Sequence, residues 1–440
     1  MIKESQMRLL LHLSRSRATL ISMKKIDYIL DFCKELGKQM IASGANIERV
    51  NMTQERICHA YGLHDVTVAN LTTRISISAK DEQKDYAHRQ TDVPPQAINL
   101  ERLKKLNNLS YYVCDNTPDV TTLYDLLHDV KSNDFPWWVI MLGFILAMMG
   151  LARIFSAGWS ELLIVELNTL VLFGLSKAVS RVHINKIITN FVSMFICSLI
   201  AMGFYALHFI NNFYIVIITN AFFLIPGIPM INCARNILCG NEMNGVIDLL
   251  KVLLEICAIV AGVAAAYAIL GGVVGNVLLE ESIVVTEITW LNSIELVFLT
   301  LLASAGFSIV FNIQLKDLPY AAVGGMIVRI VYILLQLIPS VNRFVFTIGA
   351  AFFAALYSEI LAITRKEPST LYLYPSIIPL IPGDLFYYVA LGLIWGNGAL
   401  IGRYGPDLVL SLIGISVGFV LCSTIVHYIR KFKFLKNITK

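Results

Sequence analysis

Long apolar segments alternate with short polar connections from residue 137 almost to the end of the chain. Each apolar segment is about 20 residues long, the length that an α-helix needs to cross the hydrocarbon core of a bilayer. The pattern therefore predicts membrane-spanning helices at ten places, namely residues 137–155, 160–179, 187–207, 213–232, 246–271, 292–312, 318–337, 343–363, 372–396 and 407–429.

The segment before the first span has a different pattern, because residues 24–134 contain no apolar run of spanning length. Apolar positions at helical spacing and short β-branched runs predict a small α+β domain there. Its charged residues 80–92 fit either an edge strand or a loop. The other elements are expected as helices at 26–40, 46–61, 100–115 and 119–131 and strands at 66–69 and 75–78.

One tetrapeptide occurs twice inside the apolar segments, as Leu224-Ile225-Pro226-Gly227 and as Leu380-Ile381-Pro382-Gly383. The two prolines are 382 − 226 = 156 residues apart. The same shift places every other span of the first half on a span of the second half, within a residue or two. A fixed period of that length indicates a duplicated module.

A Pro-Gly pair is unfavourable inside a spanning helix, where proline costs roughly 3 kcal/mol. In lipid, the carbonyls that it leaves unbonded need partners in protein or in a water-filled cavity. One such pair is explained equally well as a tolerated kink. Two pairs at matching places in two halves predict a broken fourth helix in each half, which is where transporters bind their substrates.

Basic residues indicate the orientation of the spans, because cytoplasmic loops carry an excess of lysine and arginine. They gather in one set of loops and in the C-terminal tail, at Lys177, Arg181, Lys186, Arg235, Lys316, Arg365, Lys366, Arg430, Lys431, Lys433, Lys436 and Lys440. Both termini are therefore expected in the cytoplasm. Since each half has five spans, an odd number, the second half must cross the membrane in the opposite sense to the first.

The predicted fold is an α-helical polytopic membrane protein with ten transmembrane helices in a 5+5 inverted repeat, plus an N-terminal cytoplasmic α+β domain. The fourth helix of each half is broken. The expected divisions are an N-terminal tail (1–23), the cytoplasmic domain (24–134), the first repeat (135–274), an extracytoplasmic linker (275–290), the second repeat (291–430) and a basic cytoplasmic tail (431–440).

Composition agrees with a cell-membrane protein. The chain has 440 residues, of which 56% are hydrophobic and 15% charged, against about 25% charged in soluble domains. Its net charge of +4 does not indicate nucleic-acid binding, because the basic residues flank the spans. The eight cysteines have no metal or disulfide spacing, so we expect no metal and no cofactor. No signal peptide is evident, and Met23 is an alternative start to Met1.

The chain resembles the threonine/serine exporter family over about residues 24–430. The resemblance rests on motifs in three regions, namely Ser43-Gly44-Ala45 with Glu48-Arg49-Val50, Leu224 to Pro229 with Asn232, Arg235 and Gly240 to Gly245, and Ala305 to Asn312 with Pro379 to Gly383. It implies ion-driven export of threonine and serine, or of small dicarboxylates such as succinate. Split members of the family look like residues 24–280 and 290–430 made separately. The Glu280-Glu281 linker and the N-terminal extension depart from the family pattern.

Candidate site residues lie first at the two breaks. A half-helix that starts near Pro229, after Pro226 and Gly227, would point free N–H groups at a substrate carboxylate; the alternative is a structural bend. Asp384 follows Pro382 and Gly383 directly. A carboxylate at this depth is a candidate for binding an ammonium group or the coupling proton, or for capping the second half-helix.

Further candidates lie on other spans. Arg329 needs an acidic partner or a substrate carboxylate in the membrane, and Glu359 or Asp384 could be that partner. Glu255 is a candidate proton site, although Asp248 and Lys251 on the same helix face favour a local charge cluster. The inner vestibule could be lined by Asn232 and Arg235, and two polar residues, Glu166 and Asn168, fall inside the second span.

The function indicated is proton-coupled export, by antiport and alternating access, of threonine and serine. The nearest alternative is a dicarboxylate exporter, in which Arg329 and Arg235 would bind the two negative charges. A channel, a membrane-anchored regulator and a hydrolytic cytoplasmic domain are weaker alternatives, because no catalytic motif joins His59, His64, His88, Asp65, Asp81 and Asp85. The expected partners are a small-molecule substrate, protons, the lipid bilayer and, as an open alternative, further copies of the chain, but no nucleic acid.

Overall fold

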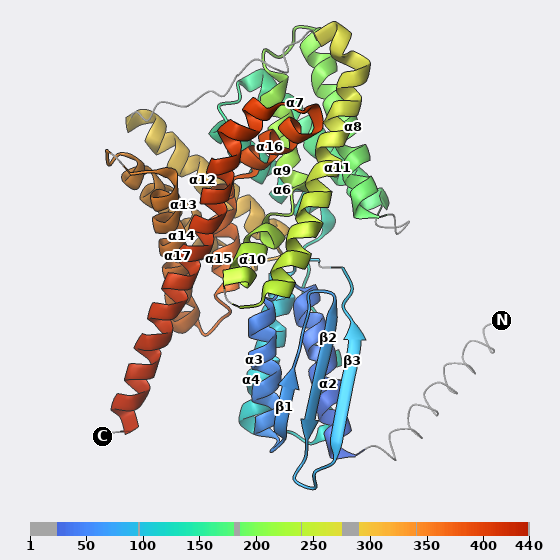
Figure 1. Ribbon diagram of the computed structural model, residues 1–440, viewed down its shortest axis with the longest axis vertical. Coiled ribbons are helices and arrows are strands. Elements are labelled where there is room, and N and C mark those ends of the chain that lie inside the picture. Colours follow the sequence, from blue (N-terminus) through green and yellow to red (C-terminus); the bar gives the residue numbers. More distant parts are fainter. Residues whose placement is uncertain are drawn as a thin grey trace, which may run out of the picture. The chain divides into compact units, whose positions relative to one another are not determined.

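The computed structural model describes residues 24–95, 97–179, 185–238, 240–274, 290–339 and 341–438. The chain forms two compact units that meet in sequence at Asn133 and Asp134 (Figure 1). The predicted N-terminal tail (1–23) and residues 275–289 of the predicted linker lie outside the described residues.

The N-terminal unit combines helices with a small sheet. Its elements are α2 (Lys25–Ala42), α3 (Ile47–Ala60), β1 (His64–Val68), β2 (Arg74–Lys80), β3 (Tyr86–Asp92), α4 (Leu100–Asn116), η1 (Val120–Thr122) and α5 (Leu123–His128).

The three strands form an antiparallel sheet in the order β1-β2-β3. In β2, the side chains of Ile75, Ile77 and Ala79 are fully buried, because alternate residues of a strand point to the same face. Helices α2 and α3 pack on the sheet. The charged stretch for which the sequence left a strand or a loop open contains β3, an edge strand.

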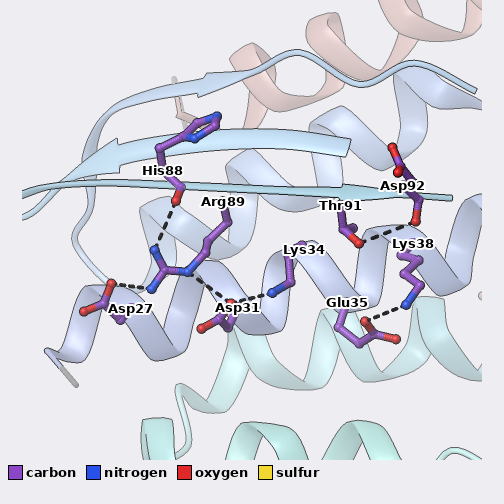
Figure 2. Close-up of polar contacts among 9 residues, drawn as sticks. All are labelled: Asp27, Asp31, Lys34, Glu35, Lys38, His88, Arg89, Thr91 and Asp92. Atoms are coloured by element: carbon purple, nitrogen blue, oxygen red, sulfur yellow. Dashed lines mark hydrogen bonds and ion pairs between the residues drawn. The ribbon is translucent and has the colours of Figure 1, made fainter. Parts of the chain in front are cut away.

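An ion-pair network fastens the edge strand to α2, as Figure 2 shows. The guanidinium group of Arg89 on β3 donates to Asp27 and to Asp31, one helical turn apart on α2. Lys34 also donates to Asp31, across 2.6 Å. The planar fork of arginine suits two carboxylates at this spacing. Because these side chains are about a quarter exposed, the network contributes to the placement of β3 more than to stability.

The C-terminal unit is helical. Its elements are α6 (Trp137–Ile154), α7 (Trp159–Val179), α8 (Lys186–Ala206), α9 (Phe213–Leu224), α10 (Gly227–Leu238), α11 (Glu242–Val274), α12 (Trp290–Val310), α13 (Leu318–Gln336), α14 (Arg343–Arg365), α15 (Thr370–Ile377), η3 (Ile378–Leu380), α16 (Gly383–Trp395) and α17 (Gly398–Ile438).

Among the described residues, eight helices are long and apolar enough to cross a membrane, and two bent helix pairs raise the number to ten if each pair is one span. The chain is therefore a mostly helical, polytopic membrane protein, as the hydropathy pattern predicts. The helices α11 and α17 are longer than the predicted spans, with 33 and 41 residues.

Corresponding helices pack on each other in the same way in the two halves of this unit. The helix α8 packs on α11 as α14 packs on α17, and α10 packs on α11 as α16 packs on α17 (Figure 1 shows α8 beside α11). The half-helices α10 and α16 start at Gly227 and Gly383, 383 − 227 = 156 residues apart. These parallels support the predicted repeat, whose inverted orientation stays a prediction.

Two glycines at matching positions let these helix pairs approach closely. A Cβ at Gly262 of α11 would lie 2.5 Å from the carbonyl oxygen of Phe191 on α8. A Cβ at Gly418 of α17 would lie 2.6 Å from the carbonyl oxygen of Ile348 on α14. Both distances are shorter than a real carbon–oxygen contact, so these crossings need glycine, as is common between membrane helices.

We predict that Gly262→Ala and Gly418→Ala each lower the melting temperature of the detergent-purified protein. The added methyl group forces two packed backbones apart, and overpacking of this kind costs about 1–3 kcal/mol. The measurement is a thermal unfolding curve, in which size-exclusion chromatography after heating gives the fraction of protein that is still folded at each temperature.

Matched controls are available on the same helices. A Cβ at Gly272 of α11 or at Gly402 of α17 meets nothing within 4 Å, so alanine there should leave the melting temperature unchanged or raise it slightly. Equal melting temperatures for Gly262→Ala and Gly272→Ala would contradict the close crossing.

Candidate functional site

The two repeated tetrapeptides form the same backbone turn. Ile225 has φ −63° and ψ 127°, and Ile381 has φ −63° and ψ 128°. In each copy the glycine N–H donates across the proline to the isoleucine carbonyl, with Gly227 to Ile225 and Gly383 to Ile381 both at 2.8 Å. Pro382 has φ −78° and ψ 57°, the values of an inverse γ-turn. The turn ends one half-helix and starts the next.

Each turn bends its helix pair sharply. The angle between α9 and α10 is 65°, and that between α15–η3 and α16 is 53°. The predicted breaks are therefore present in the structure. The new half-helices continue at once, since Met230 donates to the carbonyl of Pro226, and Phe386 to that of Pro382.

The two breaks lie against each other. A Cβ at Gly227 would lie 2.8 Å from Cδ1 of Ile381, and a Cβ at Gly383 would lie 2.6 Å from Cζ of Phe222 on α9. Each glycine thus borders a side chain of the other break's helix pair. Segments 156 residues apart in the chain form one structural feature, which is the candidate site.

Asp384 lies in the first turn of α16, beside this contact. Its side chain is half-buried, and among the described residues it forms no ion pair. The nearby Arg343 pairs instead with Asp407, across 3.6 Å. An unpaired carboxylate inside a spanning segment is a candidate for a cationic ligand or a proton.

Tyrosines lie on α9, α16 and α17, and two of them, Tyr388 and Tyr404, lie near Asp384. The rings of Tyr388 and Tyr404 stack with their centroids 4.8 Å apart. Tyr387 and Tyr214 are 1% and 7% exposed, and their hydroxyl groups have no hydrogen-bond partner within the described part of the chain. Since buried hydroxyl groups are normally bonded, these two are available to a polar ligand.

The half-helix α10 carries the candidates Pro229, Asn232 and Arg235. Pro229 lies in its first turn, where a missing N–H costs nothing. The backbone N–H of Ile228 donates to no acceptor in the described segments. Arg235 is half-buried and likewise forms no ion pair there, so its charge is available to an anion.

Arg329 lies on α13 but meets neither of its expected partners. Its Nε donates to the hydroxyl of Thr300 across 3.1 Å, and its guanidinium lies 5.7 Å from the ring centroid of Tyr332. Among the described residues it forms no ion pair. Glu359 on α14 instead lies near Cys422 of α17, because its side of α14 packs on α17 rather than on α13.

Glu255 forms an ion pair that the sequence did not predict. Its Oε2 lies 2.8 Å from Nζ of Lys186, at the start of α8. Asp248, in contrast, accepts from Asn236 of α10 across 3.3 Å. The contact with Lys186 gives Glu255 a counter-charge, although the same oxygen is buried and the geometry is not that of a hydrogen bond.

Sequence reasoning assigned no role to several polar residues that the structure brings together. Asn168 on α7 donates to Asn220 on α9 and to the carbonyl of Cys197 on α8, each across 3.1 Å. Asn220 in turn donates to the carbonyl of Val165. The only signal in the sequence is polar residues within apolar spans, and it does not say which of them meet.

The described residues of both units hold no group of three or more His, Cys, Asp or Glu side chains that could bind a metal ion.

In the N-terminal unit, Cys33 and Cys58 are fully buried with their Sγ atoms 3.9 Å apart. The hydrogen bond with Cys58 and burial raise the pKa of Cys33 well above its usual value. A thiol in that state is a poor nucleophile.

Comparison with known proteins identifies two family models along the chain. The model of threonine/serine exporters named ThrE matches residues 31–270. The model ThrE_2, described as "Threonine/Serine exporter, ThrE", matches residues 296–425. A search of curated proteins and of solved structures found no match.

We predict that Gly383→Ala destabilises the protein and that Phe222→Leu, added to it, restores much of the lost stability. The methyl group that alanine adds at this position would collide with the Phe222 ring, and a smaller side chain makes room for it. Residues in contact typically show coupling energies of about 0.5–3 kcal/mol. Melting temperatures of the two single variants and the double variant measure this coupling.

The neighbouring Phe223 provides the control, because its ring stacks on Phe144 at 4.2 Å and not on Gly383. Phe223→Leu should therefore not rescue Gly383→Ala. Equal rescue by both substitutions would show that the two breaks are not in contact.

Proposed function

The chain belongs to the threonine/serine exporter family, and on that premise we propose that it exports threonine and serine in exchange for protons. The match to ThrE covers more than half of the chain, and the match to ThrE_2 covers most of the rest. We place both termini in the cytoplasm and the two halves in opposite orientations, as the loop charges and the odd number of spans per half suggest.

The observation that carries this proposal is the contact between two identical helix breaks. Unwound backbone inside a membrane protein is tolerated only where it is enclosed in protein or lines a cavity. Inverted-repeat transporters use it to bind substrate near the bilayer midplane. Here Gly227 borders Ile381, and Gly383 borders Phe222, so the substrate site is proposed at this contact.

A zwitterionic hydroxy amino acid suits the polar groups around the breaks. Asp384 forms no ion pair among the described residues and would bind the ammonium group. The backbone N–H of Ile228, at the positive end of the α10 dipole, would bind the carboxylate. The hydroxyl group of Tyr387, one turn after Gly383 on α16, lacks a partner among the described residues and would bond the hydroxyl of threonine or serine.

A dicarboxylate substrate is the second candidate, because Arg235 and Arg329 form no ion pair within the described residues. Two unpaired cations suit two carboxylates. The candidates differ in their dependence on Asp384, since a carboxylate at the site would repel a dianion.

We predict that Asp384→Asn abolishes threonine and serine transport while the protein remains in the membrane. The neutral amide cannot pair with the ammonium group, and losing a buried charge partner costs about 2–5 kcal/mol, or roughly two orders of magnitude or more in affinity. The measurement is transport of labelled threonine, serine and succinate in liposomes with an imposed proton gradient.

Glu295→Gln is the control, because Glu295 on α12 is half-exposed and paired with Arg153; it should transport nearly as well as the wild type. Wild-type activity of Asp384→Asn would remove this residue from the site. Transport of succinate alone would favour the second candidate.

We also predict that Tyr387→Phe keeps or raises the melting temperature but lowers the preference for threonine over valine. An unbonded buried hydroxyl costs about 1–3 kcal/mol, and removing it relieves that cost. The same hydroxyl distinguishes threonine from its isostere, so competition between the two amino acids is the measurement. A lower melting temperature with unchanged selectivity would indicate a structural hydrogen bond instead.

A further inference from the structure

Glu166 is a carboxylate without a partner among the described residues, in the interior of a spanning helix. It lies on α7, about 10 Å along the axis from Trp159 at a rise of 1.5 Å per residue. Both carboxylate oxygens are buried, and neither has a hydrogen-bond partner in the structure. The helix is long and apolar enough to cross a membrane. No hydrogen bond or positive charge compensates an ionised Glu166 here, so this side chain is stable only as a neutral acid or with a bound cation.

Within the described residues, nothing packed around α7 supplies a counter-charge. The helices α6, α8 and α9 pack on it. Arg153 of α6 pairs with Glu295, and Lys186 of α8 pairs with Glu255. The remaining titratable side chains on these three helices and on α7 itself are Cys197, Tyr205, Tyr214, Glu161 and Lys177, and none of them bonds either oxygen of Glu166.

Glu161, on the same helix, is a carboxylate with a structural role. It accepts hydrogen bonds from the backbone N–H groups of Asn211 and Asn212, at 2.8 and 3.2 Å, and from the hydroxyl of Ser160. These bonds fasten the start of α7 to the start of α9. Glu166 has no such role, since it bonds nothing in the described residues.

The position of Glu166 connects it to the first helix break. The carbonyl of the preceding residue, Val165, accepts a hydrogen bond from Asn220 of α9, and α9 ends at that break. Phe173 lies two turns after Glu166 on the same face of α7. Its ring contacts Phe144, which stacks on Phe223 of α9. Glu166 therefore lies on a helix whose other residues contact α9, the helix that ends at the first break.

We infer that Glu166 binds the proton that drives export. The inference rests on the proposed function and extends it, because it separates the proton site from the substrate site at Asp384. Protonation lets the carboxyl group remain in its apolar surroundings, and release of the proton requires a conformation that admits water. A proton can then cross only with the conformational cycle, as antiport demands.

The test is transport by Glu166→Gln in liposomes, because glutamine has the shape of the neutral acid and no titratable proton. Threonine efflux driven by a proton gradient is expected to fall by about tenfold or more, since the coupling of proton and substrate is lost. Exchange of labelled for unlabelled threonine without a gradient should persist, because the substrate site is intact. The same samples should show no threonine-dependent change of internal pH.

Glu255→Gln is the matched control, since Glu255 is paired with Lys186 and should keep its coupling. Coupled export by Glu166→Gln would overturn the inference and leave the proposed function standing. Loss of coupling by Glu255→Gln alone would assign the proton to Glu255 and likewise overturn the inference. Wild-type protein that moves none of threonine, serine and succinate would overturn both.

A second readout does not need transport. Dicyclohexylcarbodiimide reacts with protonated carboxyl groups in apolar surroundings, and mass spectrometry locates the modified residue. Modification of Glu166 but not of Glu255 in the wild-type protein is the expected result, with protection at alkaline pH. An unmodified Glu166 across the pH range would contradict a proton site there.

Discussion

The membrane unit depends on one constraint, that backbone polar groups in apolar surroundings must be bonded. A proline in a spanning helix breaks this rule locally, and the chain resolves it identically twice. Gly227 and Gly383 donate to the isoleucine two residues before them, and the next helical hydrogen bonds start at the proline carbonyls. The bends follow from these two turns.

The same constraint applies to charged side chains, which are either paired with an opposite charge or without such a partner among the described residues. Asp317 is 1% exposed and pairs with Arg365 at 2.9 Å, and Glu255 pairs with Lys186. Such pairs are compensated and change little during a transport cycle. Asp384 and Glu166 have no such partner among the described residues. Under the proposed function, ligands and protons act where a counter-charge is missing, and these two carboxylates are two such positions among the described residues.

Much of the fold was predictable because hydropathy and duplication are local patterns. The spans, the breaks and the 156-residue spacing all follow from the order of the residues, and Asp384 stands out because a charge after Pro-Gly in an apolar segment is unusual. The partners of Arg329 and Glu255 were not predictable. Helical periodicity says which face a residue occupies, but not which helix lies opposite that face.

The sequence by itself determined the polytopic class, the positions of the spans and the two Leu-Ile-Pro-Gly breaks, since a bilayer selects apolar length and proline interrupts helical bonding wherever it occurs. Only the tertiary structure decided that Gly227 borders Ile381, that the hydroxyls of Tyr214 and Tyr387 lack partners among the described residues, and that Glu166 is buried without one. Those facts depend on contacts between segments far apart in the chain, and helix packing, which residue order does not encode locally, creates them.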